Sequence, residues 1–230
     1  WNFKCFSLVQ NMVAQVAQPV LVDLRGDGPR QLAALRKLMR FTAFISFPLL
    51  LGFGMVAREF IVLAITDRWL SSARLIQMLC VSGAFMPLCT LLSNAVISRG
   101  QSGAYFRATL ALGLLSIGLM AAIWPWGIRA MVGAYVALNV AWTFVWHWLV
   151  SRSMGYGLRQ FLADTVPFAL AAAGVMALTW LVTSPIESLP LLLASRVAMA
   201  AALYYGVMRV ARVRILDECV AFLLKKKRNQ

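Results

Sequence analysis

The stretch RKLMRFTAFISFPLLLGFGM, residues 36–55, has three cations in its first five positions and then runs almost entirely apolar, with Pro48 near its centre. A basic cluster beside a long apolar run is typical of the end of a membrane-spanning helix, because cations stay at the membrane surface while apolar side chains face lipid. The proline lacks a backbone N–H and weakens the helical ladder. We therefore expect a spanning helix that can bend near Pro48, Gly52 or Gly54, and Pro87 is the corresponding candidate in the next apolar run.

The composition of the whole chain agrees with a membrane location. Hydrophobic residues make up 61% of the 230 residues and charged ones only 13%, whereas a soluble domain is about half apolar and a quarter charged. A core of this size cannot hide that excess from water. The net charge of +14 would suggest nucleic acid in a soluble protein, but here the cations flank apolar runs, so we expect no nucleic-acid partner.

Apolar runs long enough to cross a bilayer follow one another along the chain. After a partial span over 1–22, we predict six full spans, and the lysines and arginines concentrate in alternate breaks between them. By the positive-inside rule, the breaks around 99–107 and 151–160, the segment before 41 and the carboxy-terminal end are cytoplasmic. The fold class predicted is an all-α polytopic helix bundle with spans at 41–65, 75–98, 106–125, 130–150, 164–183 and 191–210.

The basic tail, 211–230, is too short to span. Its apolar positions followed by KKKR suit a helix that lies on anionic lipids of the cytoplasmic leaflet. The alternative is a frayed end with no such contact.

Polar side chains within the spans are the candidates for a substrate lumen, because polar groups in lipid must face other helices or a water-filled cavity. The partial span is less apolar than the others, so we expect it to face a lumen. Asn94 and Asn139 fit either a cavity wall or a hydrogen-bonded seam between helices. Arg196 either reaches to the outer surface or binds an anion in a cavity. The lumen candidates are Lys4, Asn11, Gln15, Asn94, Asn139 and Arg196.

Catalytic and metal-binding patterns are missing from the sequence. The eight acids sit in loops or at helix ends, and there is no buried carboxylate pair, nucleophile elbow or phosphate-binding glycine loop. The four cysteines form no metal-ligand spacing with the single histidine. His147 fits an interfacial position between two tryptophans better than a proton relay. We therefore expect no enzyme activity, no metal and no cofactor.

A series of short motifs resembles the bacterial polysaccharide flippases, which are O-antigen and lipopolysaccharide-biosynthesis exporters of the multidrug/oligosaccharidyl-lipid/polysaccharide exporter superfamily. The resemblance is clearest over about residues 8–110 and continues beyond them in helix count and loop length. The motifs are, in order, QPVL, RGDGPR, ALRKLMR, FISFPLLLGF, VAREFIVL, DRWLSSARLIQMLCVSGAFMPL and ISRGQS.

The resemblance implies one lobe of a two-lobed exporter in the bacterial inner membrane, with the carboxy terminus cytoplasmic. Residues 1–183 correspond to most of the carboxy-terminal lobe, 184–210 to a closing transmembrane helix and 211–230 to the tail, and the amino-terminal lobe is a missing partner. The implied substrate is an oligosaccharide on an isoprenoid pyrophosphate, carried across by alternating access. The rival functions are a multidrug exporter of the same superfamily, a membrane glycan polymerase or ligase, and a non-transporting membrane scaffold.

Overall fold

The protein is described here from a computed structural model, which places residues 11, 15, 17–64, 69–186 and 188–210. These residues are almost entirely helical and contain no strand. Residues 17–23 are helical and lead through a short turn into the first long helix. The long elements are α2 (Gly28–Ala64), α3 (Leu70–Ser98), α4 (Ser102–Ile123), the 3-10 turn η2 (Trp124–Trp126), α5 (Gly127–Met154), α6 (Leu158–Thr183) and α7 (Leu189–Val210).

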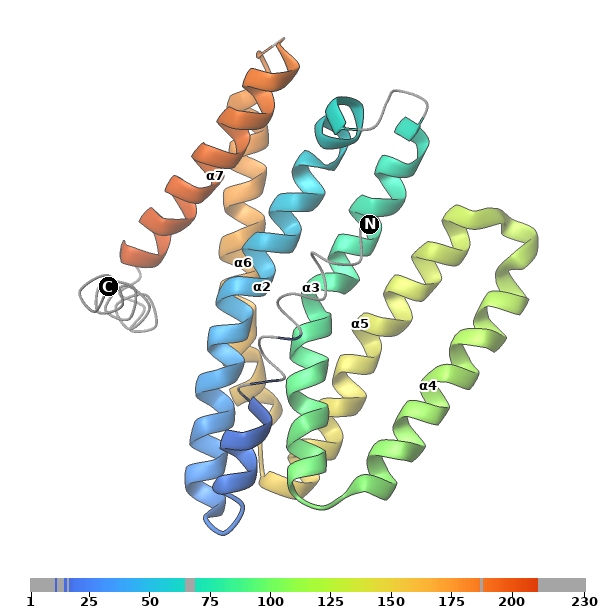
Figure 1. Cartoon of the computed structure of the whole chain (residues 1–230), viewed down its shortest axis with the longest axis vertical. Coiled ribbons are helices and arrows are strands. Elements are labelled where there is room, and N and C mark those ends of the chain that lie inside the picture. Colours follow the sequence, from blue (N-terminus) through green and yellow to red (C-terminus); the bar gives the residue numbers. More distant parts are fainter. Residues whose placement is uncertain (1–10, 12–14, 16, 65–68, 187, 211–230) are drawn as a thin grey trace.

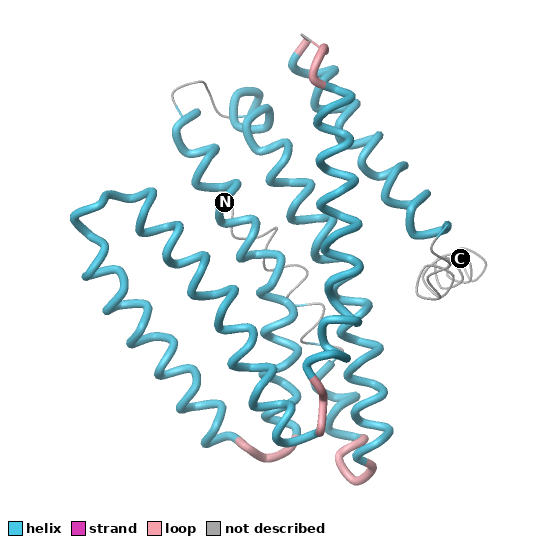
Figure 2. The backbone as a smooth tube through the Cα atoms, turned by 180° about the vertical axis from the view of Figure 1, so that it is seen from behind, coloured by secondary structure: helices cyan, strands magenta, loops and turns pink. Residues whose placement is uncertain are grey.

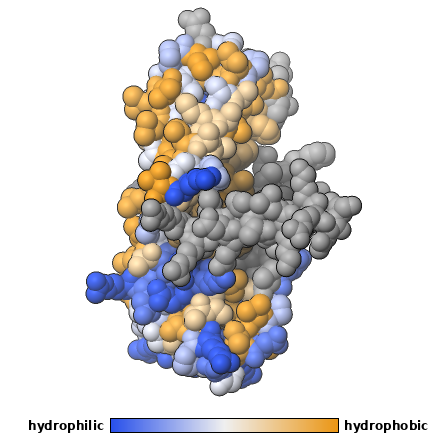
Figure 3. Space-filling view, turned by 90° about the vertical axis from the view of Figure 1, so that its left-hand side faces the viewer, coloured by the Kyte–Doolittle hydropathy of each residue, from blue (hydrophilic) through white to orange (hydrophobic). Residues whose placement is uncertain are grey.

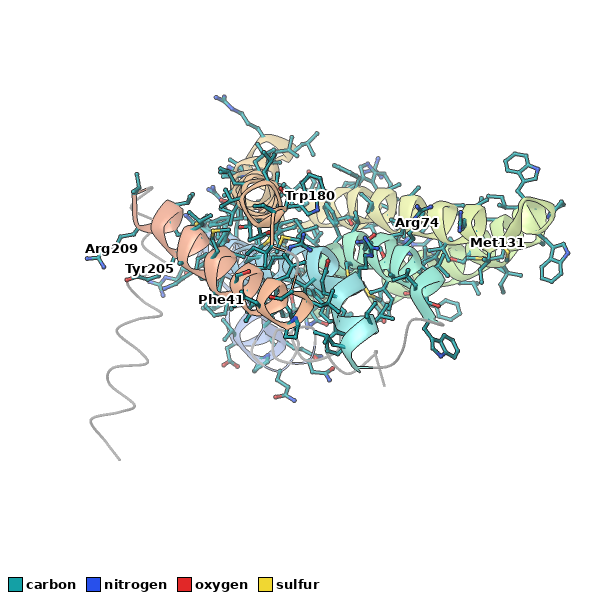
Figure 4. The ribbon with its side chains drawn as sticks, turned by 90° about the horizontal axis from the view of Figure 1, so that it is seen from above. Phe41, Arg74, Met131, Trp180, Tyr205 and Arg209 are labelled. Carbon is teal, nitrogen blue, oxygen red and sulfur yellow. The ribbon has the colours of Figure 1, made fainter. Side chains whose placement is uncertain are left out.

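The helices run up and down, so that consecutive helices are antiparallel (Figures 1 and 2). Helix α2 is central and packs against α3, α6 and α7, while α5 packs against α3 and carries α4 on its other side. Seen from above, the array is elongated, with α7 at one end, marked by Tyr205 and Arg209, and the α4–α5 hairpin, marked by Met131, toward the other (Figure 4). The hairpin therefore touches the rest of the protein mainly through α5.

Five apolar helical stretches among the described residues are long enough to cross a membrane by length and composition. One of them, Ser102–Met154, is 53 residues long and contains both α4 and α5, which fold back on each other at η2. The predicted all-helical, multi-pass membrane class is confirmed. The count of six full spans and one partial span stays a prediction, as does the division into a lobe, a closing helix and a tail.

Several helices begin earlier than the spans predicted from sequence. Helix α2 starts at Gly28 rather than near residue 41, so the basic cluster lies inside the same helix as the apolar run. The break predicted over 151–160 shrinks to residues 155–157. The reason is that a helix does not stop where its side chains become polar, and the polar turns continue the backbone ladder beyond the apolar segment.

Hydrophilic residues are concentrated at one end of the bundle, as the alternation of cations predicts. The turns α3–α4 and α5–α6 lie at the same end as the start of α2 (Figure 1). Figure 3 shows most hydrophilic residues of one side gathered at the lower end, with apolar residues over the upper part. We call the lower end, with residues 25–40, 99–107 and 152–159, the basic end.

The buried core lies between α2 and α3 and extends onto α5 and α6, with Phe47, Leu88 and Leu91 almost fully buried. At the basic end the fully buried Gln31 joins three segments, because its Nε2 donates to the Leu21 carbonyl at 2.7 Å and to the Ser98 hydroxyl at 3.3 Å. This polar link connects α2 to the first segment and to the end of α3.

Candidate functional site

A polar groove lies between α3, α4 and α5 and has a volume of about 310 Å³. Each helix contributes residues three, four or seven positions apart, which share one face of a helix. Two of the predicted lumen candidates, Asn94 of α3 and Asn139 of α5, both line it, so the structure brings them together. The lining residues are Ser82, Met86, Cys89, Thr90, Ser93 and Asn94 of α3, Tyr105, Thr109 and Leu112 of α4, and Asn139, Trp142 and Trp146 of α5.

Many polar groups of the groove hydrogen-bond within their own helix. The Asn139 amide donates to the Tyr135 carbonyl at 2.8 Å, and the Ser93 hydroxyl donates to the Thr90 carbonyl at 2.9 Å. Across helices, the Cys89 sulfur lies 3.2 Å from the Thr143 hydroxyl. Bonds of the first kind use only part of the hydrogen-bonding capacity of each side chain.

Two buried donors of this region have no hydrogen-bond acceptor among the described residues. They are the side-chain amide nitrogen of Asn94 and the indole nitrogen of Trp142. Both residues line the groove, and Asn94 is only 9% exposed. A buried donor without an acceptor is costly, and in a bilayer there is no bulk water to satisfy it. The groove lining therefore includes two buried N–H groups whose acceptor is not supplied by the described residues.

Aromatic side chains complete the groove wall. The rings of Tyr105 and Trp146 lie with their centroids 5.6 Å apart and tilted by 31°. Trp142 and Trp146 are one helical turn apart on α5 and line the same groove. Trp146 is only 5% exposed, because its ring packs inside the bundle against Tyr105 of α4.

Arg196 does not join the groove. It lies on α7, buried at 5% exposure, and its Nη1 donates to the Glu59 carboxylate of α2 at 2.7 Å. Its Nε donates to the Thr183 hydroxyl of α6 at 3.1 Å. The pair thus joins the three helices at the end of the bundle opposite the basic end. Sequence reasoning missed Glu59 as the partner, although a charged side chain inside a span calls for an opposite charge at similar depth.

A second ionic cluster joins α2 and α6 at the basic end. The buried Asp164 carboxylate accepts two hydrogen bonds from Arg36, at 2.8 and 3.2 Å, and one from the Tyr156 hydroxyl at 3.0 Å. Arg40 lies 3.6 Å from the same carboxylate. Burial, and next the negative charge of Asp164, raises the pKa of the Tyr156 hydroxyl. The sequence showed Asp164 only as an acid at a helix end, because its basic partners, Arg36 and Arg40, lie over a hundred positions away.

His147 is buried beside this cluster. Its ring packs against those of Phe161 and Tyr156, with centroids 4.8 and 5.6 Å away. His147 is only 5% exposed. Its depth relative to the membrane surface, predicted from the flanking tryptophans, stays a prediction. Contacts with α6 and the preceding loop bury the ring, and neither is visible in the local sequence.

The bend candidates lie inside continuous helices. Pro48 has no N–H to donate to the Phe44 carbonyl, and the Tyr204 hydroxyl of α7 donates to that carbonyl instead, at 3.0 Å. A Cβ on Gly52 would lie 3.3 Å from the Met176 methyl group, and one on Gly54 would lie 3.2 Å from the Cys80 Cβ. These glycines therefore let α6 and α3 approach α2 closely.

Pro87 lies inside α3, where it leaves the Gly83 carbonyl without its helical donor. The Ser46 hydroxyl of α2 donates to the neighbouring Ala84 carbonyl at 2.8 Å. A role of any of these residues as a hinge stays a prediction.

The remaining lumen candidates lie in the first segment. Asn11 and Gln15 are helical and exposed, and the structure does not place them in the groove. Lys4 lies outside the described residues, and so does the tail 211–230 with its predicted contact to anionic lipids.

Comparison with known proteins adds the biological context. A family model described as polysaccharide biosynthesis protein matches residues 2–74. The chain is also 21% identical over 165 residues to an uncharacterized membrane protein in the cps region of Klebsiella pneumoniae. The matched residues are 70% of this chain and 34% of that protein. The chain resembles membrane proteins of polysaccharide biosynthesis.

A second relative agrees with this resemblance. The teichuronic acid biosynthesis protein TuaB of Bacillus subtilis (strain 168) is 22% identical over 172 residues, which is 74% of this chain and 36% of that protein. The resemblance inferred from the sequence motifs is thereby confirmed. The chain spans about a third of the length of these two relatives. No solved structure matches the chain significantly.

Proposed function

We propose that the chain is part of an exporter that moves an isoprenoid-pyrophosphate-linked oligosaccharide from the inner to the outer leaflet of the bacterial inner membrane. The observation that carries the proposal is the polar groove, which lies inside an otherwise apolar multi-pass bundle similar to polysaccharide biosynthesis proteins. A bulky polar headgroup crosses a bilayer only where polar side chains replace water around it.

Each part of the proposal has a physical counterpart in the chain. The basic end, where residues 25–40 cluster with Arg99 and Arg152, is the cytoplasmic end by the positive-inside rule. The second lobe of the exporter is supplied by sequence outside this chain. The two lobes rock against each other, so that the headgroup meets the cytoplasm and then the outer surface. In this proposal the protein binds and moves its substrate and makes no covalent bond.

The test is leaflet exchange in vesicles. The full-length protein is reconstituted with a fluorescent lipid-linked oligosaccharide, and a membrane-impermeant quencher reports how much of it has reached the outer leaflet. We expect faster exchange than in protein-free vesicles, and slower exchange when a bulky side chain fills the groove, as in Ser93→Phe. Exchange at the protein-free rate would refute the proposal and favour a scaffold.

A parallel assay separates the multidrug alternative. A strain that lacks the gene is expected to lose surface glycan while keeping its normal tolerance of cationic dyes. Loss of dye tolerance with normal surface glycan would overturn the proposed substrate in favour of small cations.

A further inference from the structure

The groove between α3, α4 and α5 has no formal charge. Its lining consists of hydroxyls, amides, aromatic rings and a few apolar side chains, and no Asp, Glu, Lys, Arg or His lines it among the described residues. A pyrophosphate requires cations or a cluster of N–H donors aimed at one point. The charged part of the proposed substrate therefore does not fit this groove, and a neutral part does.

The two unsatisfied groups in the groove are both donors. The Asn94 amide nitrogen and the Trp142 indole nitrogen carry N–H groups, and the indole has no acceptor function. A guest that satisfies both must present acceptor oxygens on neighbouring positions of a small frame. Ring hydroxyls of a sugar, or a hydroxyl and an N-acetyl carbonyl, have that property, whereas an acyl or isoprenoid chain has none.

The aromatic wall suits the other face of such a guest. A sugar ring exposes C–H bonds on its faces and hydroxyls around its edge. The face of an aromatic ring is electron-rich and attracts the slightly positive hydrogens of C–H bonds. Trp142 and Trp146 on α5, with Tyr105 on α4, place rings and polar groups around one space. That mixture of ring faces and hydrogen-bonding groups is typical of a neutral-ligand site.

We propose that this groove is a subsite for one neutral sugar ring of the carried oligosaccharide, held by the N–H groups of Asn94 and Trp142 and stacked on the aromatic wall. The inference rests on the proposed function and adds to it which part of the substrate this chain holds. The volume of about 310 Å³ is at the lower end of small-molecule pockets, roughly 300 to 1,000 Å³, which selects one ring rather than a chain. The pyrophosphate lies elsewhere.

The experiment measures binding of soluble probes to the purified full-length protein in detergent by ligand-observed NMR. The neutral probes are N-acetylglucosamine and galactose, and the charged comparators are glucuronate and inorganic pyrophosphate. The key variant is Trp142→Phe, which removes the N–H and keeps an aromatic ring. The matched control is Trp148→Phe on the same helix, because Trp148 is 49% exposed and lies outside the groove. Asn94→Leu is the second variant.

We expect at least one neutral sugar to bind the wild-type protein and the Trp148→Phe control equally well. Trp142→Phe is expected to weaken that binding about 3- to 10-fold, as for one lost hydrogen bond, and Asn94→Leu to weaken it by a similar factor. If Asn94→Leu does not fold, as judged by its melting temperature, Trp142→Phe decides alone. Tighter binding of pyrophosphate or glucuronate, equal binding by Trp142→Phe and the control, or no binding of either neutral sugar to the wild type would each overturn the subsite.

The vesicle assay distinguishes failure of the subsite from failure of the proposed function. Wild-type exchange that is fast and unaffected by Trp142→Phe would overturn the subsite and leave the export function standing. Sugar binding that depends on Trp142, together with exchange at the protein-free rate, would support the subsite and overturn transport.

Discussion

The buried pair between Glu59 and Arg196 allows a sharp test of how the helices are held together. Both side chains are 7% exposed, and the Arg196 Nη1 lies 2.7 Å from the Glu59 carboxylate. The substitution Glu59→Gln keeps the size of the side chain and an acceptor oxygen but removes its charge. We expect it to destabilise the protein strongly, because the guanidinium of Arg196 remains buried without a counter-charge.

The size of the effect follows from the geometry. At 2.7 Å and an effective dielectric constant of about 20, Coulomb's law gives an attraction of about 6 kcal/mol. The loss in the variant should be smaller than this attraction, because Arg196 keeps a hydrogen bond to the amide oxygen introduced at position 59 and nearby side chains can shift to accommodate its charge. Measured losses on breaking a buried pair from one side are about 3 to 5 kcal/mol, and we expect a loss in this range.

The assay is equilibrium unfolding of the full-length protein in mixed micelles, followed by circular dichroism. The matched control is Arg30→Gln, which breaks the Arg30–Asp27 pair, whose side chains are 79% and 44% exposed. An exposed pair contributes about 0 to 1 kcal/mol, so the control is expected to unfold almost like the wild type. The double variant Glu59→Gln/Arg196→Met removes both charges and is expected to recover to within about 1 kcal/mol of the wild type.

Two results would refute the reasoning. A Glu59→Gln variant no less stable than the Arg30→Gln control would show that the pair is not buried in the membrane-embedded protein. A double variant less stable than Glu59→Gln alone would show that Arg196 stabilises the bundle through contacts other than the charge of Glu59.

Further predictions concern the bend and the basic end. Pro48→Ala is expected to slow glycan export without lowering protein abundance, measured by surface-glycan labelling and immunoblot; normal export would make Pro48 a tolerated bend only. Tyr204→Phe leaves the Phe44 carbonyl unpaired and is expected to cost about 0.5 to 1.5 kcal/mol in mixed-micelle unfolding. That cost should disappear in a Pro48→Ala background, where the new backbone N–H at position 48 donates to the Phe44 carbonyl. An unchanged cost would contradict the role of Tyr204 as the replacement donor. Asp164→Asn removes the charge that holds the partly exposed Arg36 and is expected to lower the free energy of unfolding by about 1 to 3 kcal/mol. The loss should be smaller in 1 M salt, and a loss that does not change with salt would count against an ionic origin.

The sequence alone was enough to predict the membrane class and the order of the helices. Uninterrupted apolar runs can only be helices facing lipid or other helices, and cations in alternate breaks set which ends lie together. The same local logic failed at helix boundaries. Helix α2 continues back to Gly28, since polar side chains beyond the apolar run do not end the backbone ladder.

Only some residues of the candidate groove could be predicted from the sequence. Asn94 and Asn139 stood out because an amide inside a span needs a polar neighbour, but nothing local showed that they share one groove or that Trp142 joins them with an unsatisfied N–H. Contacts between residues over forty positions apart depend on which helices become neighbours.

The two long-range ion pairs were decided by the tertiary structure alone. Glu59 and Arg196 are separated by 137 positions, and Arg36 and Asp164 by 128. Each residue by itself looked like a surface charge or a lumen cation. Hydropathy and charge act locally along the chain and so determined the membrane class and the order of the helices, whereas pairing energy depends on distance in space, which is set only when the helices pack.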